Sequence, residues 1–341
     1  MVGRQKATLK TISEALGISK TTVSLVLKGD GDRYRISKKT QNKIIEYADK
    51  LGFEPDFLAK ALVTRKTSTI GLIFPDVHEA FMSEMINGIE SVLYEAGYSI
   101  MLSTSGFNSE FELRNIRQLI HRKADGIIIA PYIPISDPSF SHGYLDEIKK
   151  AICPVVFVDR VPPEAQNLNW IVQDDYSAAV RAVQLLHNRG CRRIGCLSFN
   201  LDISSINSRI RGYRDGLKAV GYKTEAERLI LLEEQNAGSD DLYRKLKAVA
   251  GDTAPLDGLI VTTGGIADKV AFLKRKTDLG LNDLQLVKFG RDPEYFSSGM
   301  IQVIQPNTEM GKLAAQTILN RIADPDADVV QMEIKSTIKE E

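Results

Sequence analysis

From Thr69 onward, short apolar runs alternate with stretches whose apolar residues recur at helical spacing. The runs of strand length are TIGLIF (69–74), YSIMLS (98–103), GIIIA (126–130), PVVFV (154–158), RIGCLS (193–198), LILL (229–232), GLIVT (258–262), QLVKF (285–289) and IQVI (301–304). The helical stretches are 82–96, 109–122, 175–189, 208–220, 266–279 and 308–323. This alternation predicts parallel sheets covered by helices on both faces, with more strands than one small sheet holds.

Length and composition restrict the class of protein. A chain of 341 residues suits two or three domains, and an apolar content of 43% is enough for packed cores. The start, MVGRQKATLK, has no apolar signal-peptide region, and no run approaches the roughly 18 apolar residues of a membrane-spanning helix. The three cysteines are unpatterned and the four histidines lack metal-ligand spacing. We therefore expect a cytoplasmic protein with free thiols and no metal.

Charge is unevenly distributed along the chain. Residues 1–66 carry 14 Lys and Arg against 7 Asp and Glu, a net charge of +7, which leaves −7 on the remainder. A basic head on an acidic body favours a head that contacts a polyanion such as DNA. A solubilising surface bias would give the same charge distribution.

Two short helices separated by a glycine turn are predicted near the N-terminus. Thr8 is a suitable N-cap for a helix over 9–16, and Gly17 permits a tight turn after it. Ser19 can cap a second helix over 20–28. A helix, a short turn with glycine and a second helix are typical of the helix-turn-helix motif.

The faces of the predicted helices differ in chemistry. The second helix has an apolar inner face of Val23, Val26 and Leu27. Its opposite face carries Lys20, Thr21, Ser24, Leu25 and Lys28. A third helix, capped by Ser37, is expected to run to about residue 51 with its apolar face inward, made by Ile44, Ile45, Ala48 and Leu51. The three helices would form one compact unit.

Three segments closely resemble the lactose-repressor/purine-repressor (LacI/GalR) family of bacterial transcription regulators. They are TLKTISEALGISKTTVSLVLKG, ISKKTQNKIIEYADKLGFEPDFLAKALVTRKTSTIGLIFPD and VVFVDR. Several spaced motifs in one order are more specific than one motif, and the resemblance runs along nearly all of the chain. It implies an all-α helix-turn-helix head and an α/β type I periplasmic-binding-protein-like domain of two Rossmann-like subdomains. It also implies a repressor that binds a pseudo-palindromic operator as a homodimer.

The resemblance also implies the domain limits. The head would comprise 1–54, the hinge helix 55–67, and the effector-binding and dimerisation domain 68–341. Within that domain, the N-subdomain would comprise about 68–167 and 299–326. The C-subdomain would comprise about 168–298 and 327–341. The three crossovers between subdomains are expected near 165–169, 296–300 and 324–328.

The expected DNA contacts lie mainly on the second helix. The resemblance places Lys20 and Thr21 against base edges in the major groove. Leu25 takes a specificity position where many members have Arg or His; leucine cannot hydrogen-bond a purine edge, but it can contact a thymine methyl group. Alternatively, Leu25 is a packing residue. The remaining expected contacts of the head, several of them to phosphate, are Thr8, Ser19, Ser24 and Lys28.

The segment PDFLAKALVTRK (55–66) resembles the family hinge, a short helix that enters the minor groove. Leu62 stands where the family places an intercalating leucine, a wedge that partly unstacks a base step. Ala59 and Lys60 would lie close to the groove and the DNA backbone. The alternative is that Leu62 is a core residue of an ordinary linker helix.

Candidate effector-binding residues follow the predicted strands, because ligands of open α/β sheets bind at the carboxyl ends of strands. The residues selected in this way are Asp76, Ser105, Asp159, Arg160, Gly264 and Arg291. The resemblance adds Phe81 and Met82 as cleft-lining residues and Arg209 as an arginine that reaches the effector, with Arg211 as the alternative. Asp159 matches a carboxylate that hydrogen-bonds effectors, or it pairs with Arg160 as a hinge salt bridge.

Two departures from the family pattern bear on the effector. Gly264 stands where members carry an effector-binding Asp, and Arg291-Asp292 alters the acidic pair that usually follows the next strand. Loss of carboxylates beside Arg160, Arg209 and Arg291 favours a sugar acid or sugar phosphate, because buried arginines without partners are costly. A neutral sugar bound in another pose is the alternative.

Two other classes of protein fit the sequence less well. An enzyme is disfavoured because GxxxxGK[ST], HExxH and GxSxG motifs are absent. A sugar-binding protein without DNA function would share the sensing fold, but the basic head argues against it. We therefore expect a nucleoid-associated regulator that is not an enzyme and has no catalytic residues or cofactor. Its partners would be double-stranded operator DNA, a small-molecule effector and a second copy of the chain, with no membrane.

Replacing Leu62 with alanine tests the predicted hinge wedge. Alanine is too short to unstack a base step, so Leu62→Ala should weaken operator binding in a gel shift by roughly tenfold or more. Full operator affinity in this variant would show that Leu62 is not a wedge.

Overall fold

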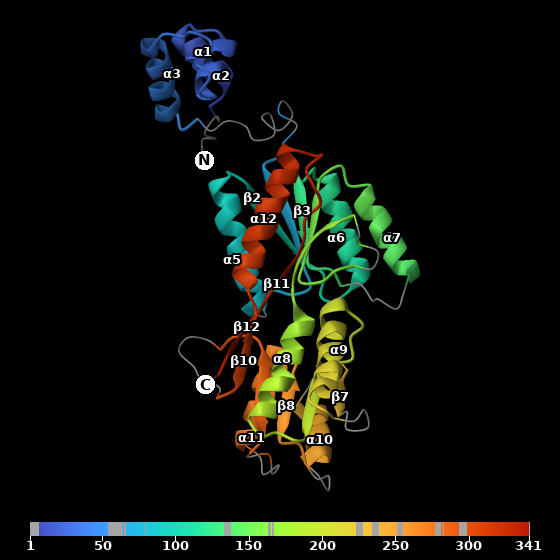
Figure 1. The fold of residues 1–341 in the computed structure, drawn as a ribbon. Helices are drawn as coiled ribbons and strands as arrows, with labels where there is room; N and C mark the ends of the chain where they lie inside the picture. The colour runs from blue at the N-terminus through green and yellow to red at the C-terminus, as the bar shows by residue number, and fades with distance from the viewer. Residues whose placement is uncertain are drawn as a thin grey trace. The chain divides into compact units, whose positions relative to one another are not determined.

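The computed structural model describes residues 7–53, 64, 66–78, 80–132, 138–162, 165, 167–222, 228–233, 239–250, 255–276, 281, 283–292 and 299–340. The chain divides into two compact units, Met1–Thr67 and Ser68–Glu341 (Figure 1). Each unit has its own hydrophobic core. Among the described helices, none is long and apolar enough to cross a membrane.

The first unit contains the three predicted helices, α1 (Leu9–Leu16), α2 (Lys20–Leu27) and α3 (Lys38–Lys50). Each begins after a hydroxyl residue whose side chain accepts a hydrogen bond from a backbone N–H of the first turn: Thr8, Ser19 and Ser37. This bond satisfies one of the donors that a helix start leaves unpaired. Gly17 ends α1 in the left-handed conformation, with φ +66°. Both the caps and the glycine turn confirm the prediction.

Fewer side chains are buried in the core of the first unit than the sequence predicted. Its buried members are Ile12, Val23, Val26, Ile44 and Ala48. Ile45 and Leu51 were expected to face inward, but each is 42% exposed. Successive helical residues differ by about 100° in direction, so Ile45 points away when its neighbour Ile44 faces the core. Leu51 is the C-cap of α3 and lies beyond its last full turn.

The second unit contains two six-stranded sheets. The sheet of the first lobe has the order β11-β5-β4-β3-β1-β2, and that of the second lobe β12-β10-β9-β8-β6-β7. The first comprises β1 (Thr69–Phe74), β2 (Ser99–Thr104), β3 (Gly126–Ile129), β4 (Val155–Val158), β5 (Asn169–Gln173) and β11 (Gln331–Ile334). The second comprises β6 (Ile194–Phe199), β7 (Leu229–Leu232), β8 (Gly258–Val261), β9 (Gln285–Phe289), β10 (Ile301–Ile304) and β12 (Thr337–Lys339). All neighbouring strands are parallel except β10 and β12.

Every predicted strand and helix of this unit is present, but several elements were missed. The missed strands are β5, β11 and β12, and the missed helices are α7 (Pro138–Lys149) and α10 (Ser239–Ala250). β5 has the sequence NWIVQ, with polar residues at both ends. It is nonetheless buried, because it pairs with β4 on one side and β11 on the other. Pairing between distant segments, not local apolar content, makes these residues a strand.

The crossings between the lobes lie later in the chain than predicted. β5 belongs to the first sheet, so the first crossing follows Gln173 and does not lie near 165–169. β10 pairs with β9 of the second sheet, which moves the second crossing from 296–300 to beyond Ile304. β11 pairs with β5, so the third crossing follows Ile334 and not 324–328. The predicted subdomain limits need the same correction, because they depended on strands assigned without knowledge of their partners.

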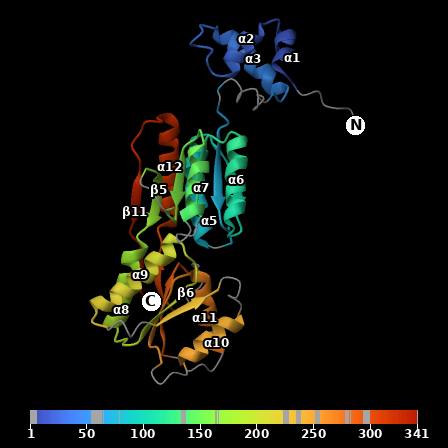
Figure 2. The ribbon, with the colours of Figure 1, turned by 90° about the vertical axis from the view of Figure 1, so that its right-hand side faces the viewer.

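Helices cover both faces of each sheet (Figures 1 and 2). In the first lobe, α5 (Ala80–Glu95) and α12 (Asn307–Ala323) pack on one face, while α6 (Ser109–His121) and α7 pack on the other. In the second lobe, α8 (Asp175–Asn188) and α9 (Ser204–Ala219) lie opposite α10 and α11 (Gly264–Lys276). Alternate residues of a strand point to opposite faces. Leu72 therefore packs toward α5 and α12, and Ile73 toward α6 and α7.

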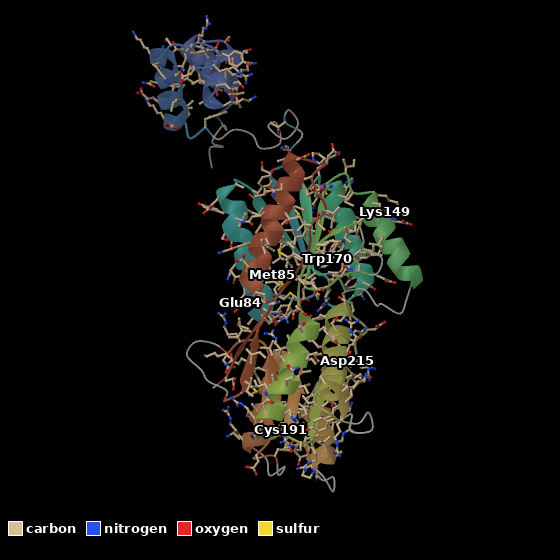
Figure 3. All side chains as sticks on the ribbon, viewed as in Figure 1. Glu84, Met85, Lys149, Trp170, Cys191 and Asp215 are labelled. Atoms are coloured by element: carbon tan, nitrogen blue, oxygen red, sulfur yellow. The ribbon has the colours of Figure 1, made fainter. Side chains whose placement is uncertain are left out.

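Two glycines allow α5 and α12 to approach closely. A Cβ atom at Gly311 would lie 2.2 Å from the backbone oxygen of Met85, and one at Gly88 would lie 2.2 Å from that of Thr308. Glu84 and Met85 lie on α5 (Figure 3), and Glu84 Oε2 accepts a hydrogen bond of 2.9 Å from Asn307 Nδ2 at the start of α12. α12 is the first element after the chain crosses back from the second lobe, and its close contact with α5 fixes its position on the first sheet.

Alanine substitutions at two helical glycines should have opposite effects on stability. Gly311→Ala forces α5 and α12 apart and should lower the free energy of unfolding by about 1–3 kcal/mol. Gly143 lies in α7, and no atom lies within 4 Å of the point that a Cβ atom there would occupy, so Gly143→Ala should raise the free energy by about 0.5–1 kcal/mol. Urea unfolding followed by the fluorescence of Trp170, the single tryptophan, measures both. Equal effects of the two substitutions would contradict the packing argument.

Candidate functional site

The outer face of α2 carries the side chains expected to contact bases. Lys20, Thr21 and Lys28 are exposed, and Ser24 and Leu25 are half-buried. Leu25 is not among the side chains that form the apolar core of the first unit. The packing alternative therefore loses support, since Val23 and Val26 hold α2 to the core without it. This face can present a cationic, hydroxyl and apolar surface to a groove.

The hydroxyls of Thr8 and Ser19 cap the N-termini of α1 and α2. Thr8 Oγ1 accepts from the Thr11 backbone N–H at 3.2 Å, and Ser19 Oγ accepts from the Thr22 backbone N–H at 3.1 Å. Both residues are exposed, so each keeps a surface position as well as its cap. Ala59, Lys60 and Leu62 of the predicted hinge lie outside the described residues.

Asp159 and Arg160 form a buried ion pair at the carboxyl end of β4. Arg160 Nε lies 3.1 Å from Asp159 Oδ2, and both side chains are less than a tenth exposed. Asp159 has a φ of +65°, a left-handed conformation that short polar residues tolerate better than most. Arg160 Nη1 also donates to the Pro131 carbonyl after β3, at 3.3 Å. The pair thus links the ends of two neighbouring strands.

A second buried ion pair joins the first residue of α8 to α9. Arg209 Nε donates to Asp175 Oδ1 at 2.7 Å, and Arg209 Nη1 donates to the Thr262 carbonyl after β8 at 2.6 Å. The guanidinium lies over the Phe289 ring, 4.6 Å from its centroid. Gln173, the last residue of β5, donates to the same Asp175 oxygen at 2.6 Å. Arg209 therefore lies at the carboxyl ends of the strands of the second lobe.

Arg211 lies elsewhere. It is exposed, and its guanidinium stacks over the Tyr176 ring at 5.0 Å. Residues two apart on a helix point in very different directions, so only one of the two arginines can face the strand ends. The structure places Arg209, not Arg211, there.

Glu112 is a buried carboxyl that sequence reasoning missed. It lies on α6 with no exposed surface, and its two oxygens accept from the Tyr132 backbone N–H at 3.2 and 3.1 Å. Burial raises the pKa of Glu112 to about 7, against the opposing effects of Tyr144, Tyr132, Arg160 and Ser105. Ser105 is itself buried at the end of β2. A lone Glu in an amphipathic helix has no pattern that would reveal this position.

The ionisable groups of the two lobes form a continuous buried cluster. Its members are Glu112, Arg160, Asp159, Asp175 and Arg209, which we call the interlobe cluster. Arg160 lowers the pKa of Glu112, and the Asp159 charge acts on Asp175. Burial raises the pKa of Asp175 to about 7, despite the opposing effect of Arg209. Burial therefore makes Glu112 and Asp175 hold their protons more tightly than exposed carboxyls do.

Residues that follow β1 are arranged differently from the expectation. Asp76 accepts hydrogen bonds from the backbone of Val77 and from His78, whose contributions outweigh desolvation and lower the pKa of Asp76. Phe81 is half-buried and packs against the hydrophobic core of the first lobe. Met82 is 1% exposed and packs in the core between α5, α12 and the first sheet. The structure thus gives Met82 a packing position.

The ends of β8 and β9 approach each other through glycines. A Cβ atom at Gly264 would lie 3.2 Å from the Phe289 carbonyl, so a larger residue would crowd the neighbouring strand. Arg291 is exposed directly after Gly290, which has a φ of +137°. Asp292 is buried and pairs with the buried Lys288 of β9, a partner that the sequence did not predict.

Pairing of the arginines removes the main reason to expect an acidic effector. That expectation depended on Arg160 and Arg209 having no partners, and each is paired with a buried carboxylate. Only Arg291 of the three is exposed. Paired carboxylate and guanidinium groups supply both acceptors and donors, which is the combination that neighbouring sugar hydroxyls require.

Comparisons with known proteins match both units. Residues 8–56 match the family described as bacterial regulatory proteins, lacI family, and residues 67–275 match periplasmic binding proteins and sugar binding domain of LacI family. The HTH-type transcriptional repressor PurR of Vibrio vulnificus is 27% identical, over 94% of this chain and 94% of its own. The ribose operon repressor of Haemophilus influenzae is 25% identical, over 97% and 96%. The lac repressor dimer bound to operator and the anti-inducer ONPF has the same fold, with a TM-score of 0.81 at 18% identity over 98% of both chains.

Neutralising Glu112 should change how stability depends on pH. Because its pKa is about 7 in the folded protein and near 4.5 when exposed, the folded state binds more protons between these values. The free energy of unfolding therefore falls as pH rises through that window, and stability is highest at its acidic end. Glu112→Gln keeps an acceptor for the Tyr132 N–H and should recover about 1–3 kcal/mol at pH 8 relative to pH 5.

Urea unfolding of both proteins at pH 5, 6, 7 and 8, followed by Trp170 fluorescence, measures this difference. Asp175 titrates in the same direction in both proteins, so some slope should remain in the variant. Identical slopes for wild type and Glu112→Gln would show that Glu112 is ionised without penalty.

Proposed function

Because the chain belongs to the LacI family of bacterial regulatory proteins, we propose that it represses transcription as a homodimer on a pseudo-palindromic operator, under the control of a small carbohydrate-type effector. It has the family's helix-turn-helix unit and its sugar-binding domain. Its relatives are transcriptional repressors, and we assign it no catalytic role. Its place of action would be the cytoplasm, on the nucleoid.

The DNA-binding half of the proposal rests on the outer face of α2. Lys20 and Thr21 lie exposed in its first turn, from which a recognition helix contacts base edges. Leu25 is one turn further along, outside the apolar core, and suits a thymine methyl group. The net charge of +7 on residues 1–66 supplies attraction to phosphate. Leu62 would add the minor-groove wedge.

The effector half rests on one observation, the two buried ion pairs that meet at the strand ends. Asp159 and Asp175 present carboxylates held by Arg160 and Arg209, from opposite lobes. These charges need no ionic ligand to balance them, which favours a neutral sugar. A sugar acid or sugar phosphate is the alternative, with Arg291 as its partner.

Binding at this position couples the effector to DNA through the lobes. The backbone N–H of Val161 donates to Ser204 Oγ at 2.9 Å, so α9 of the second lobe contacts the end of the first. A ligand that reaches both ion pairs would favour one angle between the lobes over another. In a dimer, this angle sets the spacing of the two hinge segments, and a few kcal/mol of differential affinity is enough for a switch.

A gel shift on fragments of the host genome tests the DNA-binding half. The full-length protein should retain a subset of fragments, with log affinity falling linearly as log salt concentration rises. A sugar-binding protein without DNA function would retain none. The same retained fragments then serve to score effectors.

A thermal-shift screen of neutral sugars, sugar acids and sugar phosphates tests the effector half. We expect a neutral sugar to raise Tm and to change operator affinity. Asp159→Asn should lower the affinity for that sugar by about tenfold or more, because asparagine carries no charge. The affinity for DNA without sugar should be kept, because asparagine tolerates the left-handed backbone. Arg291→Ala is the matched control and should leave neutral-sugar binding unchanged. A hit confined to acidic sugars and abolished in Arg291→Ala would instead support the alternative.

A further inference from the structure

A cavity of about 320 Å³ lies in the second lobe, at the amino ends of β9 and β10. Gln285, the first residue of β9, and Ile301, the first of β10, both line it. The last turn of α11 and the C-cap of α8 also contribute to its lining. Cys191, two residues after that C-cap, marks this end of the lobe in Figure 3. A cavity of this volume is large enough for a small metabolite.

This cavity is separate from the interlobe cluster. The strands β8, β9 and β10 run parallel, so their amino ends share one edge of the sheet and their carboxyl ends share the other. Arg209 binds the Thr262 carbonyl at the carboxyl edge, whereas Gln285 lines the cavity at the amino edge. At roughly 3.3 Å per residue, the two ends of β9 are about 13 Å apart. A small molecule in the cavity therefore does not reach the interlobe cluster.

The floor of the cavity is apolar. Leu286 of β9 and Met300 before β10 line it, and both belong to the hydrophobic core of the second lobe. Gly299 also lines it, and no atom lies within 4 Å of the point that a Cβ atom at Gly299 would occupy. The cavity therefore offers open space above an apolar surface, against which the body of a ligand can pack.

Three cations line the same cavity. Lys274 and Arg275 lie in the last turn of α11, and Arg189 is the C-cap of α8. Lys274 is half-buried, and its Nζ donates to the Leu284 carbonyl at 2.8 Å, which uses one of the three N–H bonds of an ammonium group. Burial lowers the pKa of Lys274; Asp283 opposes this effect, and the charge of Arg275 adds to it. An anion bound beside Lys274 would offset both the burial and the repulsion.

Arg189 already holds a carboxylate. Its Nε and Nη2 both donate to Glu340 Oε2, at 3.2 and 2.6 Å. The Glu340 side chain is 52% exposed, and an ion pair in contact with water contributes little, so another anion can replace it at small cost. With Asp283 and Glu340 counted, the three cations meet two carboxylates. The cavity is therefore positively charged, although residues 67–341 carry a net charge of −7.

We infer that this cavity is a second ligand site, which binds a small organic phosphate. The phosphate group binds Lys274, Arg275 and Arg189, because guanidinium and ammonium groups pair with phosphate oxygens and a doubly charged group suits several cations. The apolar part of the ligand packs against the floor of the cavity. Because the ligand and Glu340 compete for Arg189, binding releases Glu340. The site is independent of the proposed carbohydrate effector, which would bind at the other end of the same strands.

Variants that remove single charges test this site. Lys274→Gln and Arg275→Gln should each lower the affinity for phenyl phosphate by about tenfold, because each removes a charged donor. Lys276→Gln is the matched control for net charge and should leave the affinity unchanged, since Lys276 is exposed and lies outside the described lining of the cavity. Glu340→Gln should raise the affinity several-fold, because it frees Arg189 from its internal carboxylate. A merely structural role of these charges would not produce that gain.

Isothermal titration calorimetry of the full-length protein measures these affinities. Phenyl phosphate combines a phosphate group with an apolar ring, whereas inorganic phosphate and benzyl alcohol each supply only one of the two. We expect phenyl phosphate to bind at a single site per chain, inorganic phosphate to bind more weakly and benzyl alcohol not to bind. Arg291→Ala, which alters the other end of β9, should bind phenyl phosphate like the wild type.

Three results would overturn the inference. If phenyl phosphate does not bind at millimolar concentrations, the cations serve only to stabilise the C-termini of α8 and α11. Binding that is lost in Arg291→Ala but kept in Lys274→Gln and Arg275→Gln would place the anion at the carboxyl ends of the strands. An equal loss in Lys276→Gln and Arg275→Gln would show diffuse attraction to charge instead of a site. None of these results involves the operator or a sugar, so the proposed function is tested separately.

Discussion

The Asp175–Arg209 ion pair is the interaction on which the second unit, Ser68–Glu341, depends. Asp175 is the first residue of α8, immediately after the chain leaves the first sheet, and Arg209 ties it to α9 and to the end of β8. Removing two charges from water is costly, and the pair is stable only when further hydrogen bonds complete it. Gln173 and the Thr262 carbonyl supply those bonds. Breaking the pair would leave an unpaired buried charge where the two lobes join. Arrangements of the crossing segment that separate Asp175 from Arg209 are therefore disfavoured.

The interlobe cluster extends this constraint into the first lobe. Arg160 holds Asp159 and reaches the Pro131 carbonyl, while Glu112 binds the Tyr132 backbone behind it. Polar groups from several strand ends and helices therefore meet in one buried region. Such a region responds to a ligand as a unit, because a hydroxyl that displaces one hydrogen bond changes the balance of the others. If the proposed effector binds in this region, such coupling would link its binding to the angle between the lobes.

The DNA-contacting unit depends on a different set of contacts. Its small core of five buried side chains holds three helices, and caps at Thr8, Ser19 and Ser37 define where they begin. With so little core, polar anchoring matters more, and the loop after α2 is held largely by Asp32, Lys38 and Gln41. The orientation of α2 and the conformation of the loop after it both depend on these local contacts.

The sequence by itself determined the local features. Hydroxyl caps, the glycine turn and the spacing of apolar residues predicted α1, α2 and α3, and apolar runs predicted nine strands of the second unit. These features depend on residues a few positions apart, whose chemistry is visible in the chain.

Only the tertiary structure decided which sheet each strand joins and which charges pair. β5 is a strand because β4 and β11 flank it, and this pairing moved the first and third crossings between lobes. Arg209 and Asp175 are 34 residues apart, and Glu112 receives a bond from Tyr132, 20 residues away. Burial and the energy of a charge depend on such distant partners, so the pairing of Arg209 could not be read from spacing. The pairing of the adjacent residues Asp159 and Arg160 was one of the two alternatives that the sequence left open.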